Sequence, residues 1–132
     1  MELNEYQERA MDTCMESCNN WSYMFLNLVG EVGEFASKVA KAIRKEQMQI
    51  GGFIDMGTPS KNELVFNKFS TCIEQAEELK KEAGDILWQL SGLCTVMGWP
   101  LEEVAQKNLD KLAARKAVGT IDGNGDGILR DK

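Results

Sequence analysis

Apolar residues recur every three or four positions along most of the chain, and strict alternation of apolar and polar residues is nearly absent. A spacing of three to four residues gathers apolar side chains on one face of an α-helix, whereas alternation is typical of a half-buried strand. Only two prolines interrupt the chain. The pattern therefore predicts an all-α protein, a bundle of four to five helices.

Short stretches rich in glycine, proline or asparagine separate four segments with this periodicity. Ser60 and Glu63 have the spacing of a capping box, which places the start of the third helix near Ser60. Helix ends and beginnings are also indicated by Gly98, Pro100 and Gly119. The helices are expected over residues 3–18, 23–45, 60–97 and 100–118.

The length of 132 residues fits one domain with a core of its own. We expect a single helical domain over residues 1–118 and an irregular, glycine-rich C-terminal tail over residues 119–132. No apolar run approaches the roughly 20 residues that span a bilayer, so no membrane association is expected. The segment MELNEYQERAMD lacks the basic and apolar regions of a signal peptide, which predicts a cytoplasmic location.

The charge excludes some functions. A net charge of −6 and a pI near 4.7 argue against binding of a nucleic acid polymer, because such binding depends on lysine and arginine. The chain has no histidine, so imidazole chemistry and histidine-ligated metals are excluded. Carboxylates must therefore carry any metal or acid-base chemistry.

The four cysteines stand singly in helix-like segments, without a CxxC motif, and are expected to be buried reduced thiols. They are Cys14, Cys18, Cys72 and Cys94.

Two acidic pairs interrupt apolar runs. GEVGEF contains Glu31 and Glu34, and EAGDIL contains Glu82 and Asp85. Residues three apart on a helix differ by about 60° around its axis, so each pair faces one way. If the two helices pack through these faces, the four carboxylates need cations, and oxygen ligands suit Mg²⁺ or Mn²⁺.

The alternative is that each pair is a solvated stripe, paired for example with Lys38, four residues after Glu34, or with Lys81. Glycines beside the acids favour the metal site, because a glycine inside a helix is costly unless something approaches its backbone closely. They are Gly30, Gly33 and Gly84.

Three longer stretches carry a family resemblance: GEVGEFASKVAKAI, KKEAGDILWQLSGLC and KNLDKLAARKAVGTIDGNGDGILR. Together they resemble the MazG-like, all-α nucleoside triphosphate pyrophosphohydrolases, which share an ExxE…ExxD metal motif. The resemblance implies that Glu31, Glu34, Glu82 and Asp85 bind Mg²⁺. It also implies hydrolysis of a nucleoside triphosphate between its α and β phosphates, and assembly into a homo-oligomer, a dimer or a tetramer.

The sequence departs from this family in two places. The family often reads EExxE, whereas Gly30 stands at the first acid here. The spacer between the acidic pairs is longer than in compact members, with an insert within residues 46–75. These differences leave the base and the substrate open.

Several further residues are interpreted through the resemblance. Asn108, Lys111 and Arg115 form one stripe on the fourth helix and are expected to bind the nucleotide; the alternative is a solvated face. Trp88 is expected to stack on a base or to pack in the core. By its position one turn before Glu31, and not through the resemblance, Asn27 is a candidate to reach the same site; the alternative is that it does not.

The tail contains DGNGDG, which matches the opening of an EF-hand calcium loop but lacks the glutamate at position twelve and the exiting helix. Arg130 is instead expected to contact phosphates when the tail closes; the alternative is a disordered terminus.

The sequence is therefore interpreted as a Mg²⁺-dependent nucleoside triphosphate pyrophosphohydrolase that clears unwanted nucleotides, with Glu34 orienting the attacking water. The main alternative is a non-enzymatic acidic helical module that binds a partner protein. A redox di-metal protein is disfavoured because the Glu-x-x-His ligands of such bundles are absent.

Overall fold

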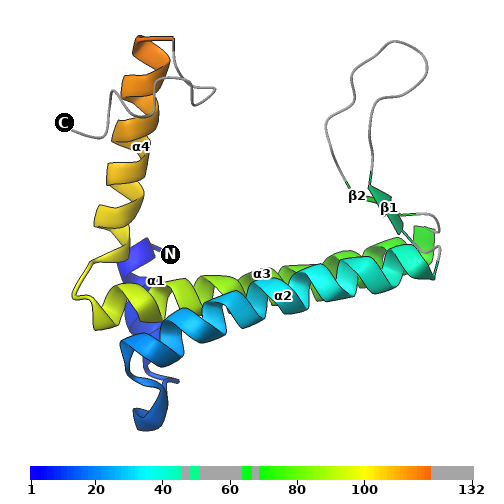
Figure 1. The fold of residues 1–132 in the computed structure, drawn as a ribbon, viewed down its shortest axis with the longest axis horizontal. Helices are drawn as coiled ribbons and strands as arrows, with labels where there is room; N and C mark the ends of the chain where they lie inside the picture. Colours follow the sequence, from blue (N-terminus) through cyan, green and yellow to red (C-terminus); the bar gives the residue numbers. More distant parts are fainter. Residues whose placement is uncertain (46–47, 51–63, 67–68, 120–132) are drawn as a thin grey trace. The chain divides into compact units, whose positions relative to one another are not determined.

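The computed structural model describes residues 1–45, 48–50, 64–66 and 69–119, and side chains within 1–45 and 75–119 (Figure 1). The long elements are all helices, so the prediction of an all-α protein is confirmed. They are α1 (Leu3–Met11), the 3-10 turn η1 (Glu16–Cys18), α2 (Trp21–Arg44), α3 (Phe69–Val96) and α4 (Leu101–Ala117). Two short strands, β1 (Met48–Ile50) and β2 (Leu64–Phe66), stand between α2 and α3.

The chain divides into two compact units. One unit comprises Ser22–Leu90, and the other comprises Met1–Trp21 together with Ser91–Lys132. Helix α3 contributes residues to both units, and each unit is described by itself.

In the unit Ser22–Leu90, α2 and α3 lie side by side and run in opposite directions (Figure 1). Ala42 of α2 and Leu79 of α3 form a small buried cluster, and Phe35 and Val39 pack against it. These α2 residues recur at three- and four-residue spacing, which places them on one face of the helix. This packing fixes α3 against the part of α2 that carries the first acidic pair.

The two strands form an antiparallel ladder in which Met48 pairs with Phe66 and Ile50 pairs with Leu64. The third helix consequently begins at Phe69 and not near Ser60 as predicted. A strand of three residues is too short to produce a visible alternation of apolar and polar positions, which is why the sequence did not indicate it. The capping-box residues Ser60 and Glu63 lie outside the described residues.

In the other unit, side chains of α1 complete the first turn of α4. Pro100 precedes α4 and offers no side-chain cap. Oε1 of the Gln7 side chain accepts a hydrogen bond from the Leu101 N–H at 2.8 Å. Oδ1 of the Asn4 side chain accepts one from the Glu102 N–H at 3.0 Å. Helix N-termini leave such N–H groups without intrahelical partners, so α1 serves as a cap distant in sequence.

The first helix ends at Met11, and the prediction that it continues to residue 18 is wrong. The Thr13 hydroxyl donates a hydrogen bond to the Ala10 carbonyl at 2.7 Å, and the chain turns there. Threonine competes in this way for backbone partners and weakens a helix. The chain then resumes as η1.

The predicted ends of the third and fourth helices are confirmed within a few residues. Gly98 and Gly119 follow α3 and α4 with φ values of 73° and 74°, a left-handed conformation that glycine adopts without a steric penalty. The glycine-rich tail after Gly119 lies outside the described residues.

Candidate metal centre

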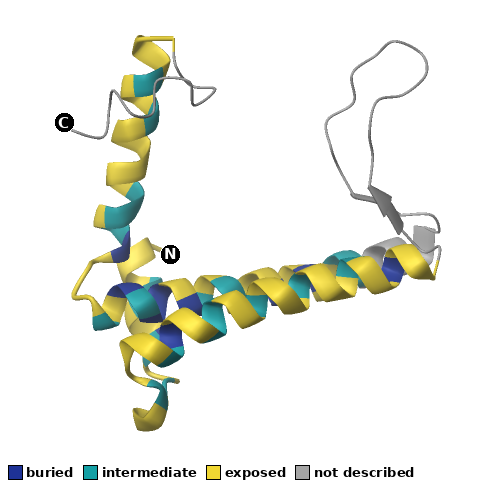
Figure 2. Cartoon of the chain, viewed as in Figure 1, coloured by how far each residue is buried: buried dark blue, intermediate teal, exposed yellow. Residues whose placement is uncertain are grey.

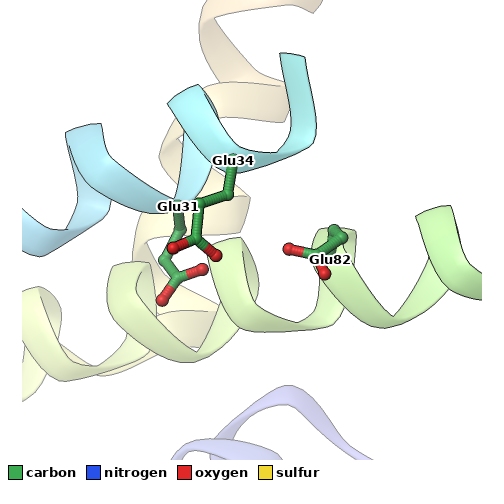
Figure 3. A group of neighbouring side chains, drawn as sticks. All are labelled: Glu31, Glu34 and Glu82. Atoms are coloured by element: carbon green, nitrogen blue, oxygen red, sulfur yellow. The ribbon is translucent and has the colours of Figure 1, made fainter. Parts of the chain in front are cut away.

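Three carboxylates gather between α2 and α3. Glu31 and Glu34 stand one turn apart on α2, and Glu82 faces them from α3 (Figure 3). One oxygen from each side chain lies within 4.8 Å of the others. A single cation between the two helices can therefore contact all three residues.

The burial of these side chains differs. Glu82 is 7% exposed, Glu31 is half-buried and Glu34 is exposed. Within the part of the chain that the structure describes, Oε2 of Glu31 and Oε2 of Glu82 are buried and accept no hydrogen bond. A buried carboxylate oxygen without a partner costs several kcal/mol unless a cation or a donor compensates it. The site thus has an inner side short of positive charge and an outer side open to solvent.

The acids influence one another. Burial raises the pKa of the Glu31 carboxyl above its ordinary value. Neighbouring negative charges raise this pKa further, in decreasing order from Glu34, Asp85 and Glu82. Asp85 itself is exposed on α3 and is not among the three residues whose oxygens converge. Its charge nevertheless acts on Glu31, so Asp85 borders the cluster.

Asn27 supports Glu31 from one turn earlier on α2. Its side-chain N–H group lies 3.4 Å from Oε1 of Glu31 and 3.4 Å from the Tyr23 hydroxyl oxygen. This contact lowers the Glu31 pKa and so opposes the larger effects of burial and repulsion. A Cβ added at Gly30 would meet Oδ1 of Asn27 at 3.5 Å, an ordinary contact distance. Asn27 thus orients one of the clustered carboxylates.

Lys38 brings a positive charge to the cluster. Its Nζ donates a hydrogen bond to Oε1 of Glu82 and lies 3.9 Å from Oε2 of Glu78. The bond to Glu82 is the main cause that raises the Lys38 pKa, against the opposing effect of burial. The solvated-stripe alternative names Lys38 as a partner of Glu34, four residues away on the same helix. Its partners in the structure lie across the helix pair, which spacing on one helix cannot indicate.

The donor set fits a hard divalent cation. All the converging atoms are carboxylate oxygens, which Mg²⁺ and Mn²⁺ prefer, and two of the buried oxygens have no partner among the described residues. Glu31, Glu34 and Glu82 would hold the ion, with Asp85 beside them.

The other predicted site residues lie on both units. Trp88 is half-buried on α3, one turn after Asp85. On α4, Asn108 and Lys111 are exposed and Arg115 is half-buried, and this helix belongs to the other unit. Roles for these residues in nucleotide binding stay predictions. Arg130 and the DGNGDG segment lie outside the described residues.

The cysteines whose side chains are described are free thiols. Cys94 is buried, and Cys14 and Cys18 are half-buried. Burial raises the pKa of the Cys14 thiol, and Cys18 raises it further. Cys72 has no described side chain.

An antiparallel helix pair with carboxylates converging from both helices defines an all-α protein with an acidic cluster that could hold a metal ion. A model of the family described as "MazG nucleotide pyrophosphohydrolase domain" matches residues 20–119, and the chain belongs to this family.

The chain is also similar to the Gene 37 protein of Mycobacterium phage L5. The two are 32% identical over 133 residues, covering 96% of this chain and 98% of the phage protein. No solved structure matches the chain. None of the helices that the structure describes combines the length and the apolar character needed to cross a membrane.

Proposed function

We propose that the protein is a Mg²⁺-dependent nucleoside triphosphate pyrophosphohydrolase that releases a nucleoside monophosphate and pyrophosphate. The observation that carries this proposal is the convergence of Glu31, Glu34 and Glu82, with two buried unpaired oxygens, in a chain of the MazG family. Mn²⁺ is an alternative ion, because it accepts the same oxygen ligands.

The proposed roles of the site residues follow from how exposed each side chain is. Buried Glu82 and half-buried Glu31 anchor the ion, and Asn27 holds Glu31 in position. An ion held by these residues would supply positive charge to neutralise the phosphates of the substrate. Glu34 is exposed, and its carboxylate orients the attacking water by accepting a hydrogen bond from it.

The proposed substrate contacts involve α3, α4 and Arg130. Lys111, Arg115 and Arg130 are proposed to pair with phosphate oxygens, Asn108 with the sugar or base, and Trp88 with the base by stacking. The biological role proposed is removal of unwanted nucleotides in the cytoplasm.

Assembly into a homo-oligomer is proposed on the exposed face of α2. Several large apolar residues there face solvent in the single chain (Figure 2). Contiguous apolar surface of this kind usually marks a protein interface. The residues are Phe25 at 43% exposure, Leu26 at 67%, Val29 at 60% and Val32 at 49%.

Product analysis tests the reaction. Purified protein with Mg²⁺ and a panel of standard, deoxy and modified nucleoside triphosphates is expected to give monophosphate and pyrophosphate in equal amounts, resolved by chromatography. Glu82→Gln should abolish turnover, and Glu77→Gln, which removes an exposed carboxylate of the same helix, should not. Release of orthophosphate instead of pyrophosphate would contradict the proposed bond cleavage. Absence of both turnover and metal binding would favour the acidic interaction module.

A further inference from the structure

Lys38 contacts the carboxylate of Glu82, which a bound metal ion would also contact. Glu82 is a member of the three-carboxylate cluster, and its Oε1 already accepts a hydrogen bond from the Lys38 ammonium. The other oxygen of Glu82 is buried and unpaired within the described residues. A divalent cation that binds Glu82 brings two positive charges to the place where Lys38 supplies one.

We infer that the Lys38 ammonium neutralises Glu82 until a divalent cation displaces it. The displaced ammonium then binds the phosphates of the substrate. This inference rests on the proposed function and adds a residue to it that the ExxE…ExxD motif does not contain.

The surroundings of Lys38 allow this exchange. The Lys38 side chain is 46% exposed, whereas the Glu82 side chain is 9% exposed, so the lysine can move away while the carboxylate stays. Oε2 of Glu78, one turn before Glu82, lies 3.9 Å from the same ammonium. It offers the ammonium a second partner when the contact with Glu82 is lost. A lysine carries its charge on a flexible four-carbon stem, which suits a group with two positions.

The charges around the site determine where the displaced Lys38 ammonium goes. Once a cation has taken Glu82, an ammonium close to it is repelled by the cation and attracted by any anion bound to that cation. The phosphates of a nucleoside triphosphate supply this anion, and lysine binds phosphate as a point charge. Lys38 stands one turn after Glu34 on α2, next to the side of the cluster that is open to solvent.

Calorimetry with Mn²⁺ alone tests the first half of the inference. Lys38→Met removes the competing charge, and we expect the Mn²⁺ dissociation constant to fall about tenfold, the scale of one unit charge a few ångströms from an ion near the surface. Lys38→Arg keeps the charge and should bind Mn²⁺ as the wild type does. Lys80→Met is the matched control, because Lys80 is exposed and pairs with Glu77, outside the cluster.

A non-hydrolysable α,β-methylene nucleoside triphosphate tests the second half. At saturating Mn²⁺, Lys38→Met should bind this analogue about tenfold more weakly than the wild type, and Lys80→Met should bind it equally well. The signature is thus tighter metal binding together with weaker nucleotide binding in one variant. A lysine that serves only as a structural ion pair would not move the two affinities in opposite directions.

Three results separate the outcomes. Unchanged or weaker Mn²⁺ binding by Lys38→Met, with Glu31→Gln unable to bind Mn²⁺, overturns the role of Lys38 and leaves the proposed metal site standing. Tighter Mn²⁺ binding with unchanged nucleotide affinity overturns the transfer to phosphate. Mn²⁺ binding that survives Glu31→Gln, or is absent in the wild type, overturns the metal site and the inference together. If Lys38→Met does not fold, Lys38→Gln removes the charge and keeps a donor for Glu82, with the same expectations.

Discussion

Individual carboxylates in this protein are held in positions that favour ion binding over stability. Glu31 is half-buried among other acids, and Glu82 is almost fully buried with one oxygen unpaired within the described residues. Without a cation, such groups repel one another and lack solvation, which lowers the free energy of unfolding. The stability of the folded chain and the occupancy of the site are therefore linked.

Glu31→Gln makes this linkage measurable. Without metal, the variant should be more stable than the wild type by about 1 kcal/mol, because a neutral side chain replaces a charge that its surroundings disfavour. With Mn²⁺ at about 100 times its dissociation constant, the wild type should gain about 2.7 kcal/mol and the variant almost nothing. Thermal unfolding with and without Mn²⁺ measures both effects, and an equal Mn²⁺ effect on the two proteins would contradict the assignment of Glu31.

The sequence indicated the acids but not their arrangement. The i, i+3 spacing places Glu31 and Glu34 on one face of a helix, and this depends only on helix geometry. The pairing of Lys38 with Glu82 depends on how two helices pack, which the local pattern does not encode. For the same reason the spacing could not show that Glu82 is buried while Asp85 is exposed.

At the scale of the elements, glycine had to be interpreted by position. Gly98 ends α3 with a φ of 73°, whereas Gly33 lies inside α2, where an added Cβ would meet nothing within 4 Å. The sequence interpretation expected close approach of a backbone or of a ligand beside the acidic pairs, and no backbone of the described chain approaches Gly33 in this way. Helix ends marked by glycine were predictable, but the start of α3 was not, because the ladder of β1 and β2 precedes it.

Replacing each of these two glycines with alanine is expected to change the free energy of unfolding in opposite directions. Gly33→Ala should raise the free energy of unfolding by about 0.5–1 kcal/mol, because alanine favours a helix interior. Gly98→Ala should lower it by about 1 kcal/mol or more, because a side chain strains the left-handed conformation. Urea unfolding of the two variants measures the difference, and equal shifts in the same direction would contradict the assigned conformations.

Gln7 joins α1 to the end of α3, to the connection between α3 and α4, and to the start of α4. It accepts from the Leu101 N–H, and its N–H group donates to Oγ1 of Thr95 at 3.1 Å and to the Trp99 carbonyl at 2.9 Å. Gln7→Leu should lower the free energy of unfolding by about 1–2 kcal/mol, because it leaves these groups without their partner.

Gln106→Leu is the control for Gln7→Leu. Gln106 is exposed on α4, and its side-chain N–H group donates a hydrogen bond to Oδ1 of Asp110 on the same helix at 2.9 Å. Its loss should cost no more than about 0.5 kcal/mol. Urea unfolding that gives equal losses for the two variants would contradict the role of Gln7 as a distant cap.

At the scale of the whole molecule, an acidic chain exposes a group of apolar residues along α2. The net charge is −6, yet Leu26 and Val29 on α2 are more than half exposed. A net negative charge keeps a protein soluble, but it does not remove the tendency of a contiguous apolar surface to associate.

Val29→Glu should therefore shift the protein from oligomer to monomer, because a charge would have to be buried at the interface. Analytical ultracentrifugation measures the change. Leu109→Glu is the control, since Leu109 on α4 is similarly exposed at 59% and lies outside the α2 surface. A monomeric wild type, or an unchanged oligomer in Val29→Glu, would contradict the proposed interface.

The capping of α4 by α1 also orders events during synthesis. Gln7 and Leu101 are 94 positions apart, so α1 leaves the ribosome well before the helix that it contacts. Contacts between distant residues form late because closing a long loop carries an entropic cost. Helix α1 must therefore wait, without this partner, until the start of α4 has been made. A truncation before α4 would leave the side chains of Gln7 and Asn4 without these contacts.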